Sequence, residues 1–230
     1  MARGILYGVG VGPGDPELLT RKAERIIRES PVLAVPHKGG GEKTAMGIIG
    51  DLARGKELLY CDAPMIRDET VLDAAYEANA DKVCAFLDRG KDVAFITLGD
   101  PTVYSTYIYL HRKVAARGYE AVIIPGVPSF CAAAARLGEP LCEKSERLMI
   151  VPASHGSLED CLALDANLVF MKAGREIGAL KEKLADCGLL EHSGLVANCG
   201  LEGELICPDL AQLKEDTGYF SVVVVKKGKQ

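Results

Sequence analysis

The stretch "GVGVGPGDPELLT", residues 8–20, joins an apolar run to an amphipathic one through a turn rich in glycine and proline. An apolar strand that ends in such a turn and leads into a helix is typical of α/β proteins, which bind ligands beside such turns. The stretch does not carry the dinucleotide-binding pattern GxGxxG, because Pro13 and Asp15 occupy the positions that the last glycine would take. It therefore predicts an α/β fold that binds a different ligand.

The first half of the chain repeats this alternation of strand and helix. We expect strands at residues 4–11, 31–36, 56–61, 92–98 and 120–126, and helices at residues 16–29, 72–88 and 101–117. In the first of these helices, Leu19, Ala23, Ile26 and Ile27 share one face, as an amphipathic helix requires. Strands that alternate with helices indicate a largely parallel sheet.

The second half begins with "PGVPS" at residues 125–129 and an alanine-rich helix at 130–137. It continues with strands at residues 146–153, 166–173, 193–200 and 219–227 and with one clear helix at 175–187. We interpret the pattern as two α/β domains, residues 1–124 and 125–230, and we expect the ligand between them.

The composition excludes several classes of protein. A net charge of −5 over 230 residues argues against binding nucleic acid through a broad basic face, although a few local cations can still hold an anionic small molecule. The aliphatic runs are far shorter than the roughly 20 residues that span a bilayer, and the start of the sequence lacks the pattern of a signal peptide. We therefore expect a cytoplasmic protein without a membrane partner.

Neither the cysteines nor the second glycine run predicts a site. The eight cysteines form no CxxC pair and the four histidines lie far apart, so we expect no metal site and reduced thiols, mainly in the core. The glycine run at residues 39–41 precedes Lys43 and Thr44, but the order Gly-Lys-Ser/Thr of a phosphate loop is missing. We expect a mobile loop there.

The triplet Gly-Asp-Pro occurs at residues 14–16 and again at 99–101, each time between an apolar strand and an amphipathic helix. Glycine permits a turn with positive φ, Asp can cap a helix, and Pro suits the first helical position, so caps alone would explain each triplet. The turn at 125–129 also follows a strand. Three such turns at carboxyl ends of strands favour a ligand site, because that edge of an α/β sheet binds ligands.

With these turns in place, the chain resembles the tetrapyrrole methylases, which use S-adenosylmethionine to methylate uroporphyrinogen-derived rings. "GVGVGPGDPELLT", "TLGDPTVYST" and "IPGVPSF" look like the family's three loop segments. "LGDPTVYSTYIYL", "NCGLEGE" at residues 198–204 and "YFSVVVVK" are most similar to the enzymes that methylate carbon 20 of precorrin-2 or cobalt-factor II. The resemblance covers essentially the whole chain.

The resemblance implies an N-terminal αβα domain with a mainly parallel sheet, a C-terminal α/β domain with a mixed sheet, a homodimer, and S-adenosylmethionine in the cleft between the domains. It assigns the cofactor contacts to Gly99, Asp100, Pro101, Val103, Tyr104, Ser129, Phe130, Met171 and Leu201. Asp100 and Ser129 can equally be helix caps, and Met171 can be an ordinary core residue.

Two residues are candidates for a role in the chemistry. The resemblance places Asp15 on the tetrapyrrole side, as a polar contact or base, with helix capping as the alternative. Tyr104 can orient substrate or cofactor, or only pack. The substrate class carries carboxylates, for which Lys38, Lys43, Arg67 and Lys172 are suitable cations by their loop or strand-end positions.

Three functions stay open at this point. The first is methylation of carbon 20 of precorrin-2 or cobalt-factor II, with or without cobalt in the ring. The second is another activity within the family, at a different ring carbon or on the modified histidine of an elongation factor. The third is a sensor that binds S-adenosylmethionine without transferring its methyl group.

Overall fold

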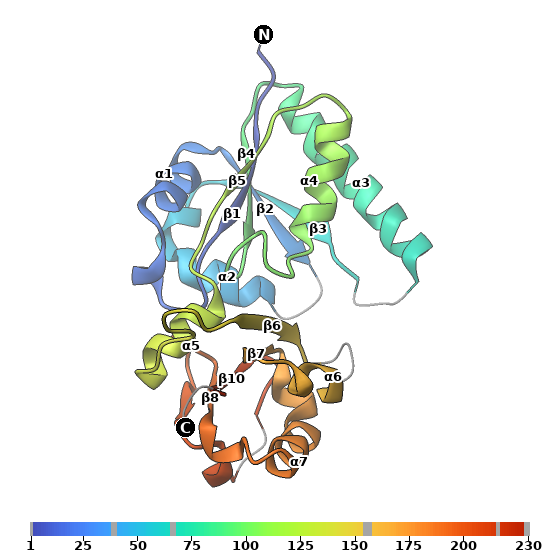
Figure 1. Ribbon diagram of the computed structural model, residues 1–230. Coiled ribbons are helices and arrows are strands. Elements are labelled where there is room, and N and C mark those ends of the chain that lie inside the picture. Colours follow the sequence, from blue (N-terminus) through green and yellow to red (C-terminus); the bar gives the residue numbers. More distant parts are fainter. Residues whose placement is uncertain (1, 38–40, 65–67, 154–157, 215–216, 228–230) are drawn as a thin grey trace. The chain divides into compact units, whose positions relative to one another are not determined.

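The computed structural model describes residues 2–37, 41–64, 68–153, 158–214 and 217–227, with the backbone alone at 41–43. The chain divides into two compact units, Met1–Pro128 and Ser129–Gln230, called here the N-terminal and the C-terminal unit (Figure 1). The segment 125–128, which we predicted to open the second domain, belongs to the N-terminal unit because the Gly126 amide bonds to Asp100 there.

The N-terminal unit is built on a five-stranded sheet in which all strand pairs are parallel, in the order β3-β2-β4-β1-β5. Its strands are β1 Leu6–Gly10, β2 Val32–His37, β3 Glu57–Asp62, β4 Val93–Thr97 and β5 Ala121–Ile124. Its helices are α1 Arg21–Glu29, α2 Gly41–Ile49, α3 Glu69–Leu87 and α4 Tyr107–Ala116. The predicted parallel α/β unit is confirmed.

The helices cover the two faces of this sheet in pairs (Figure 1). On one face, Ile27 of α1 and Ile48 of α2 pack on Leu33 and Ile96. On the other, Val83 of α3 and Leu110 of α4 pack on Phe95. The central strands β1, β2 and β4 are buried on both sides, which explains why they are almost continuously apolar in sequence.

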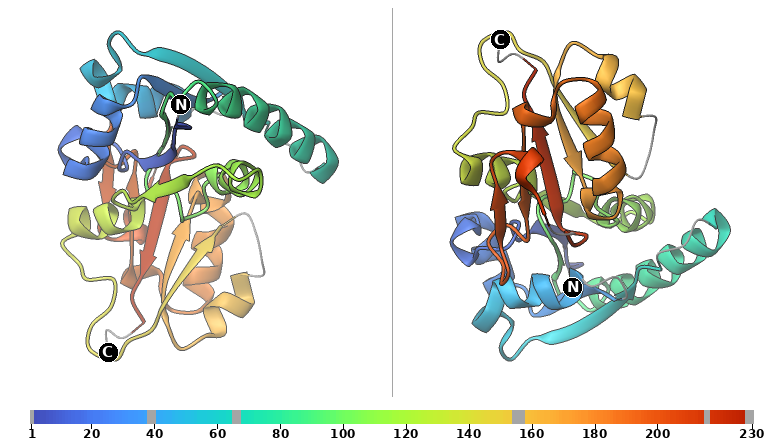
Figure 2. Two further views of the ribbon diagram at one scale, coloured as in Figure 1. Left: turned by 90° about the horizontal axis from the view of Figure 1, so that it is seen from above. Right: turned by 90° about the horizontal axis from the view of Figure 1, so that it is seen from below.

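The C-terminal unit holds a mixed sheet in the order β6-β7-β10-β8-β9, with β6 parallel to β7 and the other pairs antiparallel. Its strands are β6 Leu148–Pro152, β7 Asn167–Met171, β8 Ser193–Ala197, β9 Leu205–Cys207 and β10 Ser221–Val225. Helix α5 Ser129–Leu137 lies on one side of the strands, and α6 Leu158–Ala163 and α7 Ile177–Asp186 lie on the other (Figure 2). The mixed second sheet is confirmed.

Several elements differ from the prediction for local reasons. The helix expected at 16–29 is a 3₁₀ turn at Pro16–Leu18 followed by α1, which Thr20 caps through a bond from the Ala23 amide of 3.1 Å. The helix expected from Pro101 begins only at Tyr107. The mobile loop expected near Lys43 and Thr44 is part of α2, although residues 39 and 40 lie outside the described residues.

The short elements α6 and β9 were not predicted at all. Helix α6 has six residues and strand β9 has three, so neither shows a full period of apolar residues. Both become clear only through their packing on the C-terminal core.

Candidate functional site

The strands β1 and β4 are parallel neighbours whose chains leave the sheet toward opposite faces. The chain after β1 forms α1, which packs on one face, and the chain after β4 forms α4, which packs on the other. Such a divergence is a topological switch point, and α/β sheets bind ligands in the crevice that it opens at the carboxyl ends of the strands. Both Gly-Asp-Pro turns lie at this point of the N-terminal unit.

The backbones of the turns are locked together. Gly12 and Gly99 form an isolated antiparallel bridge, in which the Gly99 amide donates to the Gly12 carbonyl at 2.8 Å. A Cβ atom added to Gly10 would lie 2.6 Å from both the Gly126 nitrogen and the Gly99 oxygen. Only glycine permits this approach, so the glycines of the opening stretch bring three loops to one place.

Asp100 joins two of these loops by hydrogen bonds. Its Oδ2 accepts from the Gly126 amide at 3.0 Å and its Oδ1 from the Thr102 amide at 2.8 Å and from the Thr102 hydroxyl. The residue is only 8% exposed. The alternative that Asp100 caps a helix from Pro101 is wrong, because the chain turns at Pro101 and α4 starts only at Tyr107. Its carboxylate instead fixes the third turn against the second.

Asp15 does act as a cap, but of a shorter element than predicted. Its Oδ1 accepts from the Glu17 amide at 2.9 Å and begins the 3₁₀ turn. The residue is half-buried. Thr20, which caps α1, also donates to the Pro125 carbonyl at 3.4 Å and so ties the first turn to the third.

The segment 101–106 presents one aromatic side chain to solvent. Tyr104 has a left-handed backbone with φ 48° and is 48% exposed, whereas Pro101 is buried and Val103 is half-buried. The hydroxyls of Thr97 and Ser105 lie 2.9 Å apart and close the segment onto the end of β4. An L-residue with positive φ is strained, and such strain concentrates at functional sites.

In the C-terminal unit, three predicted contacts lie on α5 and at the end of β7. Ser129 is the first residue of α5, where it is half-buried, and Phe130 is buried beside it. Met171 ends β7 and is half-buried, and it pairs with Val222 of β10. Leu201 lies in the loop after β8, and Val222 also pairs with Val196. Strand register therefore brings the ends of β7 and β8 to the same edge of the second sheet.

The segment 172–174, which follows Met171, contains the cationic Lys172 and lies in close contact with residues 217–219. Lys172 has a left-handed backbone with φ 59°, and its Nζ lies 5.8 Å from the centre of the Tyr219 ring. A Cβ atom on Gly174 would lie 1.9 Å from the Gly218 carbonyl oxygen. Among the other predicted cations, Lys38, Arg67 and the side chain of Lys43 lie outside the described residues.

One buried polar atom at this edge lacks a partner. Among the described residues, Thr217 carries a buried Oγ1 that makes no hydrogen bond. Its carbonyl oxygen lies 2.5 Å from the position that a Gly174 Cβ would take, so the backbone of Thr217 lies against the segment that follows Met171 and Lys172. A buried hydroxyl without a partner costs free energy, which a bound polar ligand would recover.

The described part of the chain holds no cluster of three or more His, Cys, Asp or Glu side chains that could bind a metal ion. It also holds no helix long and apolar enough to cross a membrane. The eight cysteines are free, with Cys61, Cys84, Cys161, Cys199 and Cys207 buried. Burial raises the pKa of the Cys61 thiol to about 12, which makes it inert as a nucleophile at neutral pH.

Sequence reasoning missed the residues that hold these turns in place. Thr102, Thr97 and Ser105 follow or precede a turn and have no recognisable pattern of their own. Glu204 ends the segment "NCGLEGE", but its ion pair with Arg136, with 3.0 Å between Nε and Oε1, was not predicted. Arg136 and Glu204 are 68 residues apart in sequence, and the left-handed backbone of Asn198 in the loop before Glu204 is visible only in the folded chain.

Comparison with known proteins gives a family and named relatives. The family model for Tetrapyrrole (Corrin/Porphyrin) Methylases matches residues 5–214. The cobalt-precorrin-2 C(20)-methyltransferase of Salmonella typhimurium is 34% identical over 97% of both chains. The probable cobalt-precorrin-2 C(20)-methyltransferase of Methanocaldococcus jannaschii is 35% identical over 98% of this chain and 97% of its own.

Another relative is longer than this chain. The cobalamin biosynthesis protein CobIJ of Mycobacterium tuberculosis is 33% identical over 100% of this chain, which spans 47% of that protein's length.

Solved structures share the fold. Uroporphyrin-III-C-methyltransferase of Thermus thermophilus superposes with a TM-score of 0.71 at 25% identity, over 98% of this chain and 95% of that one. A second structure of the Thermus thermophilus enzyme, complexed with S-adenyl homocysteine, gives a TM-score of 0.70 at 20% identity, over 97% and 98% of the two chains.

Proposed function

We propose a function from one premise: the chain belongs to the tetrapyrrole (corrin/porphyrin) methylase family. Within that family it transfers a methyl group from S-adenosylmethionine to carbon 20 of precorrin-2 or cobalt-factor II, a step in cobalamin biosynthesis. The observation that carries the proposal is the identity of 34–35% with proteins named C(20)-methyltransferases over nearly their full length. The protein works as a homodimer in the cytoplasm.

We assign the predicted contact residues of each unit to the binding of S-adenosylmethionine. The assigned residues of the N-terminal unit are Gly99, Asp100, Pro101, Val103 and Tyr104, and those of the C-terminal unit are Ser129, Phe130, Met171 and Leu201. The unpartnered hydroxyl of Thr217 supports this assignment, since it leaves a buried hydrogen-bonding group unused in a residue whose backbone lies against Gly174, three residues after Met171. A protein of the same fold was solved with S-adenyl homocysteine, which supports the choice of cofactor.

When bound, S-adenosylmethionine supplies a methyl group already activated by its sulfonium. The task of the protein is therefore alignment, and holding two reactants in near-attack geometry can contribute about 7–11 kcal/mol. The locked junction of Gly10, Gly99 and Gly126 provides the rigid edge that alignment requires. The bonds of Asp100 keep two loops of that edge in register.

The ring carbon must lose a proton after it receives the methyl group. Asp15 is the candidate that accepts this proton or orients the ring, because its carboxylate lies on the first turn and is half-buried. Tyr104 orients the substrate or the cofactor from the exposed side of the second turn. Lys172 pairs with a ring carboxylate, since its ammonium stands at the end of β7.

The proposal is tested by binding and turnover with the purified chain. Calorimetry with S-adenosylhomocysteine is expected to show one site per chain. Anaerobic incubation of S-adenosylmethionine with precorrin-2 or cobalt-factor II is expected to raise the ring's mass by one methyl group. Tight binding without methylation of either ring would contradict the proposal and favour a sensor, whereas methylation of only a later intermediate would favour another enzyme of the family.

A further inference from the structure

The loop between β8 and β9, residues 198–204, is held in an unusual conformation. Asn198, Gly200 and Gly203 have left-handed backbones with φ of 51°, 72° and 74°. The Asn198 amide donates to the Phe220 carbonyl at 2.9 Å, which fastens the start of the loop to the residue before β10. Such a conformation at the non-glycine Asn198 persists only where surrounding contacts enforce it. The loop carries Leu201, one of the proposed cofactor contacts.

Glu204 adds side-chain contacts to the bonds within the loop, in which the Asn198 side chain donates to the Gly203 carbonyl at 3.3 Å and the Leu201 amide donates to the Asn198 carbonyl at 2.8 Å. Its Oε1 accepts from the Gly200 amide at 2.8 Å and from Nε of Arg136 at 3.0 Å. Its side chain is only 23% exposed. Charge-assisted bonds of this kind are about twice as strong as neutral ones, and partial burial protects them from solvent screening. One carboxylate thus closes the loop and joins it to a helix.

That helix is α5, which connects the loop to the other proposed contacts of the C-terminal unit. Arg136 lies in the last turn of α5, and Ser129 and Phe130 lie in its first. Because a helix of nine residues is rigid, an anchor at its end fixes the loop relative to its start. The helix also packs on β8 and β10, the strands that lead to and from this edge.

Cys199 is a buried thiol next to the Glu204–Arg136 ion pair. It is 7% exposed and lies beside both side chains. Burial raises the pKa of its thiol to about 11, and the negative charge of Glu204 adds to that rise. A thiol in this place is unreactive as long as the loop stays closed.

We propose that Glu204 and Arg136 are positioning residues for cofactor binding, which hold Leu201 in place relative to Ser129 and Phe130. The pair acts through the loop and touches neither cofactor nor substrate. This inference rests on the proposed function, because it assumes that these residues contact S-adenosylmethionine.

The test measures the dissociation constant of S-adenosylhomocysteine by calorimetry. Glu204→Ala removes the acceptor of both bonds and is expected to raise the dissociation constant about tenfold, as is Arg136→Met. Glu204→Gln keeps the acceptor without the charge and is expected to raise the dissociation constant less.

In all three variants, kcat at saturating S-adenosylmethionine is expected to stay near the wild-type value, whereas KM for S-adenosylmethionine is expected to rise. Asp165→Asn removes an exposed ion pair of the same unit and is the matched control, with no expected change.

A second readout follows the loop itself. Mass spectrometry after brief alkylation is expected to find Cys199 modified faster in Glu204→Ala than in the wild type, and protected again by S-adenosylhomocysteine. The exposed Cys131, Cys142 and Cys187 should label at unchanged rates. A wild-type dissociation constant in Glu204→Ala, or an unchanged alkylation rate at Cys199, overturns the inference. A wild-type chain that binds no S-adenosylhomocysteine overturns the proposed function together with it.

Discussion

At the scale of single residues, the glycines of the opening stretch act mainly by leaving space. A Cβ atom at Gly8 would overlap the ring of the fully buried Tyr107, and one at Gly10 would meet the backbone of Gly99 and Gly126. The pattern predicted a turn and a ligand edge; the turn lies at the carboxyl end of β1, as predicted, and the ligand edge stays a prediction. The partners of these glycines are distant in sequence, so no local pattern could identify them.

Replacing Gly10 by Ala tests this close approach. Because the obstructing atoms belong to the backbone, they cannot move aside cheaply, and we expect the free energy of unfolding to fall by about 1–3 kcal/mol. Gly47 in α2 is the matched control, since a Cβ there meets no atom within 4 Å. Gly47→Ala is expected to stabilise the chain by about 0.4–1 kcal/mol. Urea unfolding measures both, and equal effects would refute the packing argument.

Asp15 has two roles that one substitution separates. Asn caps helices about as well as Asp but carries no negative charge, so Asp15→Asn keeps the bond from the Glu17 amide. If the carboxylate takes part in the chemistry, turnover is expected to fall at least tenfold with stability and S-adenosylhomocysteine affinity unchanged. A wild-type rate would leave Asp15 as a cap alone.

At the scale of elements, the strands were easier to predict than the helices. β8 and β10 are buried along their whole length, so their apolar runs are unmistakable in sequence. The apolar face of α1 was equally clear in the sequence, but the residue at which α1 starts was not. Asp15 and Thr20 are both good caps, and each begins a separate element. The role of Asp100 was missed for a related reason: its partner Gly126 lies 26 residues away.

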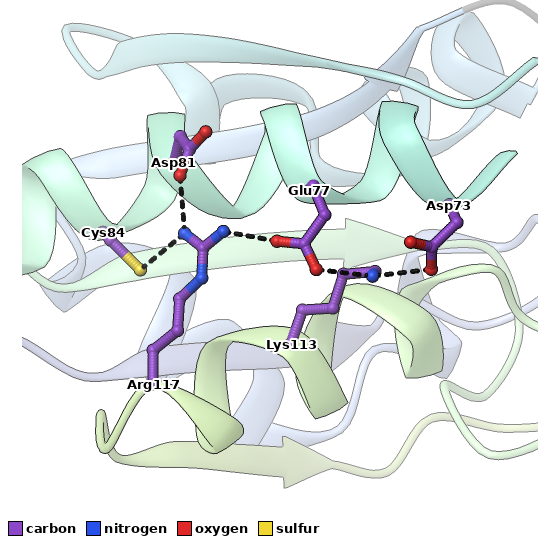
Figure 3. A network of polar contacts seen from close by, with 6 residues as sticks. All are labelled: Asp73, Glu77, Asp81, Cys84, Lys113 and Arg117. Atoms are coloured by element: carbon purple, nitrogen blue, oxygen red, sulfur yellow. Dashed lines mark hydrogen bonds and ion pairs between the residues drawn. The ribbon is translucent and has the colours of Figure 1, made fainter. Parts of the chain in front are cut away.

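Helices α3 and α4 are joined by a network of charges along their contact (Figure 3). Lys113 contacts Asp73 and Glu77 at 2.6 and 2.7 Å, and Arg117 contacts Glu77 and Asp81 at 2.5 and 2.8 Å. Glu77 is the shared member, and its bonds with Lys113 and Arg117 lower its pKa. The network holds the two helices in register on one face of the first sheet.

This network predicts a pH dependence of stability. The pKa of Glu77 is lower in the folded chain than in the unfolded one, so its contribution is fully present above the unfolded value of about 4.5 and is lost as the pH falls. Glu77→Gln is therefore expected to lower the urea midpoint at pH 6 and to match the wild type more closely near pH 3. Asp51→Asn, at an exposed pair, is the control with no expected effect. A difference between wild type and Glu77→Gln that does not vary with pH would contradict the assignment.

At the scale of the whole molecule, the alternation of strands and helices was enough to predict two α/β units and a parallel first sheet, whereas the mixed second sheet was predicted only from the family resemblance. The candidate site could be predicted only in part. Its turns follow from glycine and proline chemistry, whereas the residues that hold it, such as Glu204 and Arg136, are set by contacts between distant segments. Resemblance to a family therefore carried the function further than the residues alone.

The substrate is the central claim at this scale, and locating the transferred methyl group tests it most directly. The purified chain is incubated anaerobically with S-adenosylmethionine labelled with ¹³C in its methyl group and with precorrin-2 or cobalt-factor II, and the product is examined by NMR. We expect the label on carbon 20, and the faster of the two substrates identifies whether cobalt is already in the ring. Label at any other ring carbon, or no label on either ring despite cofactor binding, would contradict the account.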